Sequence, residues 1–199
     1  MQNKKNEAEM KSVKQHRIES YFIDAAKKII RNEGAQSVTV RKIAELSGYS
    51  YGSIYNYYAD LDELMFETRN AMIYDLMEGM SNEPAMTSFE LEDFKRLNRM
   101  FLDYFIENPN IYEFFYIFKI KKKGITPIEA MNLSERNKQN YMGFVENGTI
   151  LESDLDAVFK AILYSLYGIL TLYFSSYTMT KAQAYADLDK IIEYILRKR

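Results

Sequence analysis

Several residue types on which protein chemistry depends are missing or scarce in this 199-residue chain. It has no cysteine, which excludes disulfides, thiolate metal ligands and a thiol nucleophile. Its one histidine, His16, has no second histidine with which to share a metal ion or a proton relay, and no glycine-rich phosphate loop is present. Catalysis would have to rest on scattered carboxylates and tyrosines. We therefore expect no enzyme activity, no metal and no cofactor.

Residues that interrupt helices are also rare, with 3 prolines and 8 glycines in the whole chain. This scarcity favours an all-α fold with one sizeable core or two small packed units. No run of about 18 apolar residues is present, and the polar, charged amino terminus differs from a signal peptide. The lack of cysteine suits a reducing compartment. We expect a soluble, cytoplasmic protein with no membrane partner.

Positive charge is concentrated toward the amino terminus, although the formal net charge of the chain is −2. Residues 1–60 hold 10 Lys and Arg against 7 Asp and Glu, whereas residues 61–199 hold 16 against 21. A surface that contacts nucleic acid needs such cations. The charge asymmetry is modest, so it supports nucleic-acid binding only together with other features of the sequence.

The stretch from Ser37 to Phe66 has the pattern of two short helices, a glycine turn between them, and a longer third helix. Thr39 and Ser50 are good N-cap residues, and Gly48 can adopt the backbone that a tight helix exit needs. In the second short helix only Ile54 is an aliphatic residue that can point inward. Hydroxyl, amide and aromatic groups occupy its other sides and are suited to hydrogen bonds with phosphates and base edges.

The run TVRKIAELSGYSYGSIYNYY, residues 39–58, resembles the helix-turn-helix of the TetR family of transcriptional regulators. The resemblance covers roughly residues 15–75 and departs from the family pattern at two positions. Leu61 stands where the family usually has a lysine that contacts a phosphate, which removes one expected contact and leaves the effect on DNA affinity open. Asn56 replaces the usual His or Tyr and changes what the second helix can read.

Nine residues of this unit carry side chains suited to contacting DNA: Thr39, Arg41, Lys42, Ser50, Tyr51, Ser53, Tyr55, Asn56 and Tyr57. Arg41 and Lys42 would neutralise phosphate charge, and Thr39 could donate its hydroxyl or backbone N–H to a phosphate. Tyr55 and Tyr57 are expected to anchor phosphates. The candidates for reading base edges are Ser50, Tyr51, Ser53 and Asn56.

The remaining chain predicts further helices, each with its own start signal. Residues 1–15 are polar and basic, and we expect a flexible arm or a frayed helical extension there, either solvated or following the DNA backbone. Residues 16–60 would form the helix-turn-helix domain and residues 61–199 a helical ligand-binding and dimerisation domain. About nine helices are expected, three in the first domain and six beyond it. Their expected bounds are Arg17–Glu33, Val40–Ser47, Tyr51–Tyr57, Leu61–Asn82, Thr87–Glu107, Pro109–Lys123, Thr126–Asn147, Ser153–Tyr177 and Thr180–Arg199.

The helix expected from Leu155 to Tyr177 is apolar or aromatic almost all round, which a soluble monomer of this size seldom buries completely. It could be a central core helix, or it could form a four-helix interface with the last helix and their copies. The TetR resemblance implies the second arrangement. A homodimer would present two recognition helices about 34 Å apart, so its DNA site should be a near-palindrome.

Aromatic and methionine side chains are abundant between residues 72 and 145 and are either core or the lining of a pocket for an apolar or aromatic effector. Asp103, Glu107 and Glu113 lie near them in sequence and could hold a cationic ligand. Tyrosines with hydroxyls that need partners when buried are the pocket candidates, namely Tyr104, Tyr112, Tyr116, Tyr141 and Tyr167.

These patterns predict a sequence-specific DNA-binding regulator, a repressor released from its operator by a small molecule. The alternatives are a helical protein-interaction module, or a regulator without a functional pocket. The interaction module predicts tight dimers without salt-dependent binding to duplex DNA.

Overall fold

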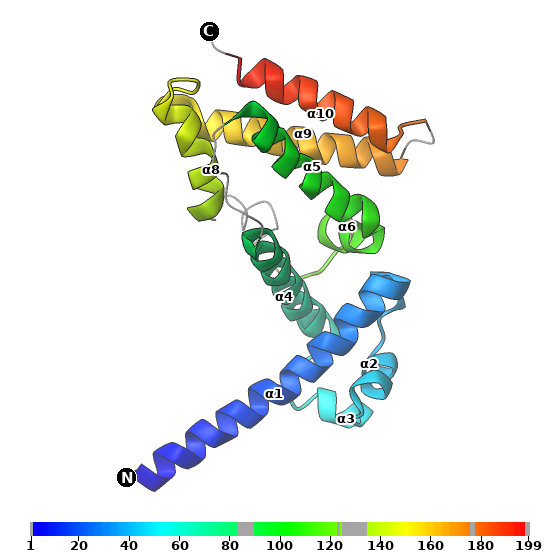
Figure 1. Cartoon of the computed structure of the whole chain (residues 1–199). Helices are drawn as coiled ribbons and strands as arrows, with labels where there is room; N and C mark the ends of the chain where they lie inside the picture. Colours follow the sequence, from blue (N-terminus) through cyan, green and yellow to red (C-terminus); the bar gives the residue numbers. More distant parts are fainter. Residues whose placement is uncertain (1, 83–89, 123, 125–134, 176–177, 198–199) are drawn as a thin grey trace. The chain divides into compact units, whose positions relative to one another are not determined.

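The computed structural model describes residues 2–82, 90–122, 124, 135–175 and 178–197, and these residues contain helices and no strand (Figure 1). The all-α prediction is confirmed. In chain order the elements are α1 (Gln2–Glu33), η1 (Ala35–Ser37), α2 (Val40–Ser47), α3 (Tyr51–Ile54), α4 (Leu61–Asn82), α5 (Leu91–Glu107), α6 (Pro109–Tyr116), α8 (Glu135–Glu146), η2 (Glu152–Asp154), α9 (Leu155–Ser175) and α10 (Lys181–Ile195).

The chain divides into two compact units. The amino-terminal unit contains Met1–Leu76 and Asn110–Ile125, and the carboxy-terminal unit contains Met77–Pro109 and Thr126–Arg199. The first unit thus includes the 16–60 segment, most of α4 and a segment from the middle of the chain. The predicted domain bounds at residues 15 and 60 stay a prediction, and the backbone of the expected arm continues α1 as a helix from Gln2.

The amino-terminal unit is built around the carboxy-terminal half of α1. This helix ends at Glu33 as predicted, and Gly34 follows with a φ of 85°, a left-handed backbone that residues with a Cβ avoid. Its buried face packs on α2 through an apolar cluster that recurs at three- and four-residue steps: Phe22, Ala26, Ile29, Ile30, Ile43 and Ala44. The helix-turn-helix is therefore anchored on one rigid helix.

Helix α6 is shorter than expected, which corrects the prediction of a helix continuing to Lys121–Lys123. It starts at Pro109 as expected but ends at Tyr116. The N–H groups of Ile117 and Phe118 both donate to the carbonyl of Glu113, at 2.9 and 2.8 Å, and this shared acceptor closes the helix. The chain that follows runs to α4 in the same unit, where Asp62 accepts its backbone N–H groups.

The carboxy-terminal unit packs α9 against α10, α5 and α8 (Figure 1). Its core holds Phe94 edge-to-face against Tyr141 and Phe144, with ring centroids 5.0 and 5.2 Å apart. Charged pairs join α5 to α10 at the edge of this core. Lys95 is buried and contacts Glu92 and Glu193 at 2.6 Å each, and Arg99 forms a bidentate pair with Asp189. These hydrogen bonds raise the pKa of Lys95 above its ordinary value.

Three expected helix starts differ from the structure or lie outside its described part. Helix α5 begins at Leu91 with Glu90 as its N-cap, so Glu90 does not lie inside a helix that begins at Thr87. Thr87 and the helix start expected at Thr126 lie outside the described residues. Helix α9 begins at Leu155, and Ser153 lies within the preceding η2, where its hydroxyl donates to Asp154. Thr180, by contrast, caps α10 by accepting from the Gln183 N–H at 3.1 Å.

Helix α9 is long and apolar enough to cross a membrane by length and composition alone. Such a helix is weak evidence for a membrane protein, since core helices of soluble proteins share these properties. One side of α9 is buried in the carboxy-terminal unit through Phe159, Ile162, Leu163, Leu166, Ile169 and Leu170. The other side carries apolar and small residues on the surface of that unit.

Candidate nucleic-acid interface

Helix α2 begins where the sequence predicts, at a threonine cap. The Thr39 hydroxyl accepts a hydrogen bond from the Lys42 N–H at 3.2 Å, which satisfies one of the free donors of the first turn. Val40, Ile43 and Ala44 are buried beneath the helix. The Thr39 residue itself remains exposed, so its hydroxyl and the first N–H groups of α2 lie at the surface.

The turn between α2 and α3 has the predicted glycine and serine geometry. Gly48 adopts a left-handed backbone with φ 74°, and the Tyr49 N–H closes on the carbonyl of Ala44 at 3.2 Å. Ser50 then caps α3 by accepting from the Ser53 N–H at 3.2 Å, and the two serine hydroxyls lie 2.7 Å apart. The two serines that the sequence offers as base-reading candidates are thus held against each other at the start of α3.

Helix α3 is shorter than the Tyr51–Tyr57 helix that the sequence predicts. It ends at Ile54, and residues 55–57 form a turn held by backbone bonds such as Tyr57 N–H to Ile54 carbonyl at 3.0 Å. Ile54 is its one buried residue, as expected. Tyr51 and Tyr55 are 55% and 45% exposed, and their hydroxyls lie 3.1 Å apart. That hydrogen bond raises the pKa of Tyr55 above its ordinary value.

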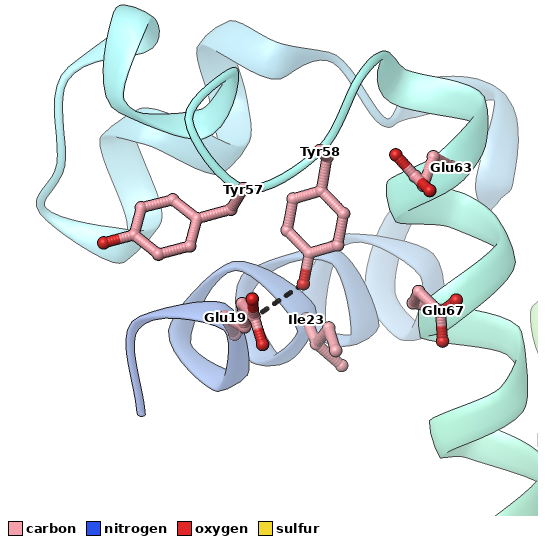
Figure 2. A pocket seen from close by; sticks show the side chains of 6 residues that line it. All are labelled: Glu19, Ile23, Tyr57, Tyr58, Glu63 and Glu67. Carbon is pink, nitrogen blue, oxygen red and sulfur yellow. Dashed lines mark hydrogen bonds between the residues drawn. The ribbon is translucent and has the colours of Figure 1, made fainter. Parts of the chain in front are cut away.

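The two tyrosines that follow have different environments. Tyr57 is half-buried and contacts Phe22 of α1, with ring centroids 5.7 Å apart. Tyr58 is buried, and its hydroxyl donates to the carbonyl of Glu19 at 3.4 Å (Figure 2). Burial raises the pKa of Tyr58. Sequence reasoning missed this anchor, although the four-residue spacing from Ile54 would have indicated a second inward side chain.

The cations of this unit are not equivalent. Arg41 is exposed and forms no ion pair with a described residue, whereas the Lys42 ammonium lies 2.5 Å from Glu33. Asn56 is exposed in the turn after α3. Arg41 and Asn56 therefore reach solvent directly, while Lys42 would have to exchange an exposed ion pair for a phosphate. Such an exchange costs little, because exposed ion pairs contribute at most about 1 kcal/mol.

A shallow cleft of about 270 Å³ lies between α1, the turn after α3 and α4. Figure 2 shows its lining residues, which are Glu19, Ile23, Tyr57, Tyr58, Glu63 and Glu67. The Ala59 N–H and the Lys122 ammonium both bond Glu63 and hold its pKa below the ordinary value. No group of three or more His, Asp or Glu suited to a metal ion occurs among the described residues.

The start of α4 carries a variant of the capping box. Asp60 accepts from the Glu63 N–H at 2.8 Å, and Glu63 reaches back to the N–H of Ala59 rather than to that of Asp60. Both bonds fix the backbone where the turn after α3 leads into α4. Leu61, the residue in place of a lysine, is half-buried.

The five tyrosines predicted as pocket candidates are not all in one unit. Tyr112 and Tyr116 belong to the amino-terminal unit, with ring centroids 5.2 Å apart, and Tyr104, Tyr141 and Tyr167 belong to the carboxy-terminal unit. Tyr141 is buried between Phe94 and Phe159, and its burial raises its pKa. Its position is that of a core residue. The assignment of all five to a ligand pocket stays a prediction.

Two of the three carboxylates considered for a cationic ligand have partners within the protein. Asp103 accepts from the Tyr185 hydroxyl and lies 2.5 Å from the Lys181 ammonium. Glu107 lies 3.7 Å from the same ammonium. The carboxylates of Asp103 and Glu107 thus help to join α5 to α10, whereas Glu113 lies in the other unit, where its carbonyl closes α6.

Residues 22–68 match the profile of the family described as bacterial regulatory proteins, tetR family. RolR in complex with resorcinol has a TM-score of 0.68 and 17% identity, covering 94% of this chain and 89% of that chain. A TetR-family regulator from Mesorhizobium loti has a TM-score of 0.63 and 15% identity, with coverages of 92% and 96%. Thermus thermophilus FadR, a TetR-family repressor in complex with lauroyl-CoA, has a TM-score of 0.58 and 19% identity, with coverages of 90% and 91%.

No curated protein sequence matches this chain. At these identities the solved structures show the fold, and the profile match covers the part of the chain that forms the helix-turn-helix. The matched residues include the caps, the glycine turn and the exposed face of α3 described above. The chain thus carries a helix-turn-helix that matches the tetR family profile, in a fold that is similar to those of solved TetR-family regulators.

Proposed function

We propose that this protein is a sequence-specific DNA-binding repressor that leaves a near-palindromic operator when a small molecule binds. The observation that carries the proposal is the chemistry of α3, whose one buried side chain is Ile54. All of its other side chains, and those of the turn that follows, offer hydroxyl, amide or aromatic groups. A helix this polar contributes little to a core, but its groups are suited to phosphates and base edges.

Dimerisation is the second part of the proposal, and the outer side of α9 supports it. Ala161, Tyr164, Gly168 and Leu172 follow one another at three- and four-residue steps and are exposed. Tyr164 is 57% and Leu172 is 54% exposed, and space beside Gly168 is open. An apolar stripe with small residues favours close packing against a second copy, with α10 completing a four-helix interface. The two-fold axis then makes the operator a near-palindrome.

Release by an effector is the third part. RolR and FadR are each described with a small molecule, resorcinol in one case and lauroyl-CoA in the other. By analogy with those two proteins, we propose an apolar or aromatic effector for this chain. Such a molecule must bind more tightly to the conformation that holds the recognition helices away from the operator, because equal affinity for both conformations shifts nothing. Its role is regulatory rather than enzymatic, and action on chromosomal DNA implies a cytoplasmic location.

The test is selection of random duplex DNA on the purified full-length protein at 50 and 200 mM salt. We expect enrichment of a palindrome with half-sites about one helical turn apart, with affinity falling steeply as salt rises. The enriched duplex then serves as the probe for effectors that release it. Absence of any enriched sequence at both salt concentrations, with tight dimers in solution, would instead support a protein-interaction module.

A further inference from the structure

A lysine-bearing segment from the middle of the chain is attached to the start of α4, the helix that follows the recognition turn. We call residues 117–122 the lysine segment. The backbone N–H groups of Lys121 and Lys122 donate to the carboxylate of Asp62, at 3.1 to 3.2 Å. Asp62 lies 59 residues away from Lys121 in sequence. The lysine segment is therefore held beside the helix-turn-helix by contacts that sequence alone does not suggest.

Side-chain contacts reinforce this attachment. The Lys122 ammonium lies 2.9 Å from Glu63 and 4.9 Å from the ring centroid of Phe66. Just beyond the segment, a Cβ on Gly124 would meet the Phe66 ring at 2.2 Å, so only glycine fits there without displacement. Backbone, charge and packing thus fix the segment at three successive points along the first turns of α4.

The lysines of the segment differ in burial from its apolar residues. Phe118 and Ile120 are half-buried, whereas Lys119 and Lys121 are exposed. The ammonium groups of Lys119 and Lys121 can therefore be reached from solvent. Neither forms an ion pair with a described residue. The protein therefore presents two ammonium groups that are not neutralised within the part of the chain that is described.

The attachment point lies close to the recognition turn. Glu63, which binds Lys122, also accepts from the Ala59 N–H at 2.8 Å, and Ala59 directly follows the turn that carries Asn56 and Tyr57. A duplex that reaches this turn would also pass near the first turn of α4. That turn is acidic, with Asp60, Asp62 and Glu63, and would repel phosphates unless cations lay beside it.

From these contacts we infer that Lys119 and Lys121 form a second contact to the DNA backbone, beside the helix-turn-helix. The inference rests on the proposed DNA-binding function and adds a phosphate-binding surface drawn from outside residues 22–68. Lys122 positions the segment through Glu63, while Lys119 and Lys121 meet the phosphates. Leu61 offers no charge at the start of α4, and the two lysines supply it there. Because they meet only phosphates, they add affinity without sequence preference.

The experiment compares the wild-type protein with Lys119→Ala/Lys121→Ala, using the selected duplex and a random-sequence duplex as probes. Affinity is measured at several salt concentrations between 50 and 200 mM. Loss of two phosphate contacts should lower the salt slope by about 1.8 and weaken binding to both duplexes alike, by roughly 25- to 60-fold near 0.1 M salt. Lys119→Arg/Lys121→Arg keeps both charges and should bind like wild type.

Arg96→Ala is the matched control, because Arg96 is an exposed cation of α5 in the other unit, outside α9 and α10. Its affinity and slope should equal those of wild type. Wild-type binding that is salt-dependent, with the lysine-segment variant equal to Arg96→Ala, would overturn this inference and leave the proposed function standing. Wild-type protein that binds neither duplex would overturn both.

Discussion

Helices α3 and α9 each leave one face on the surface of their unit, but the chemistry of the two faces is opposite. The exposed side of α3 and its turn carries Tyr51, Tyr55 and Asn56, whose polar groups can exchange water for other hydrogen-bond partners. The exposed side of α9 carries Ala161, Tyr164 and Leu172 beside Gly168, and gains little from water. A polar face suits a charged, hydrated partner, whereas an apolar face suits a copy of itself. This difference is the basis for proposing DNA as the partner of α3 and a second copy of the chain as the partner of α9.

Helices α3 and α9 also differ in the contacts that hold them in place. The four-residue α3 is fixed by one buried residue, Ile54, with the cap of Ser50 and the neighbouring anchor Tyr58. Helix α9 buries one whole side against three other helices. Substitution of Ile54 alone can therefore detach α3 from its unit. Substitutions on the outer side of α9 should leave the folding of each copy unchanged and affect only its association with a second copy. The following predictions test this contrast.

The largest effect is expected on association when the apolar face of α9 receives a charge. Leu172→Glu would bury an unpaired carboxylate in the proposed interface, at a cost of roughly 3–5 kcal/mol, or on the order of a thousandfold in the dimer dissociation constant. Sedimentation velocity measures it. Leu151→Glu is the matched control, because Leu151 is 67% exposed but precedes η2 and α9. Equal dimerisation of the two variants would contradict the proposed interface.

Removal of the α3 anchor should chiefly affect stability. Ile54→Ala leaves a cavity under the recognition helix and is expected to cost about 2–5 kcal/mol of unfolding free energy, together with DNA binding. Urea unfolding followed by circular dichroism measures the change. Ile117→Ala removes an exposed isoleucine of the same unit and should change stability by less than about 0.5 kcal/mol. A small effect at Ile54 would mean that α3 is held by other contacts.

Substitution of an exposed polar residue should alter sequence preference rather than folding. Asn56→Ala is expected to relax discrimination at one base pair of each half-site, by about 1–3 kcal/mol. Repeating the duplex selection with this variant measures the change, and its thermal unfolding should match that of wild type. An identical enriched palindrome would remove Asn56 from the base-reading set.

The smallest effects are expected from residues that meet only phosphates. Arg41→Ala should weaken binding to all sequences and lower the salt slope by about 0.9. Tyr55→Phe should weaken binding uniformly by about 0.5–1.5 kcal/mol, since one neutral hydrogen bond is lost. Titrations with cognate and random duplexes measure both. A change in preferred sequence would move either residue into the base-reading group.

Much of the helix-turn-helix could be predicted because its signals are local. Thr39, Gly48 and Ser50 act on N–H and carbonyl groups within a few residues of themselves, and their caps have the predicted geometry. The length of α3 was overestimated, since the tyrosines that follow Ile54 can belong equally to a helix or a turn. Contacts of Tyr57 and Tyr58 with residues of α1 decide that these tyrosines lie in a turn.

The lysine segment shows where local signals mislead. Lys121–Lys123 has the composition of a helix carboxy terminus, yet α6 ends at Tyr116. The N–H groups that would have continued the helix instead bond Asp62, which is far away in sequence. Asp62 lies in the first turn of α4, where an acidic residue favours the helix start, and its bonds to the lysine segment could not be inferred without the fold. The DNA-binding and pocket residues remain predictions, because their partners would be other molecules.

The hydrogen bond between Tyr51 and Tyr55 has a calorimetric consequence. In the free protein the two hydroxyls lie 3.1 Å apart, so one of them donates its hydrogen to the other. A phosphate or base that accepts from the donating hydroxyl replaces this bond, and one that accepts from the other hydroxyl replaces a bond to water, so the net heat from these tyrosines should be small. Association would then draw its free energy mainly from the entropy of released counterions. Isothermal titration should therefore record weak heats, even where the duplex binds tightly at low ionic strength.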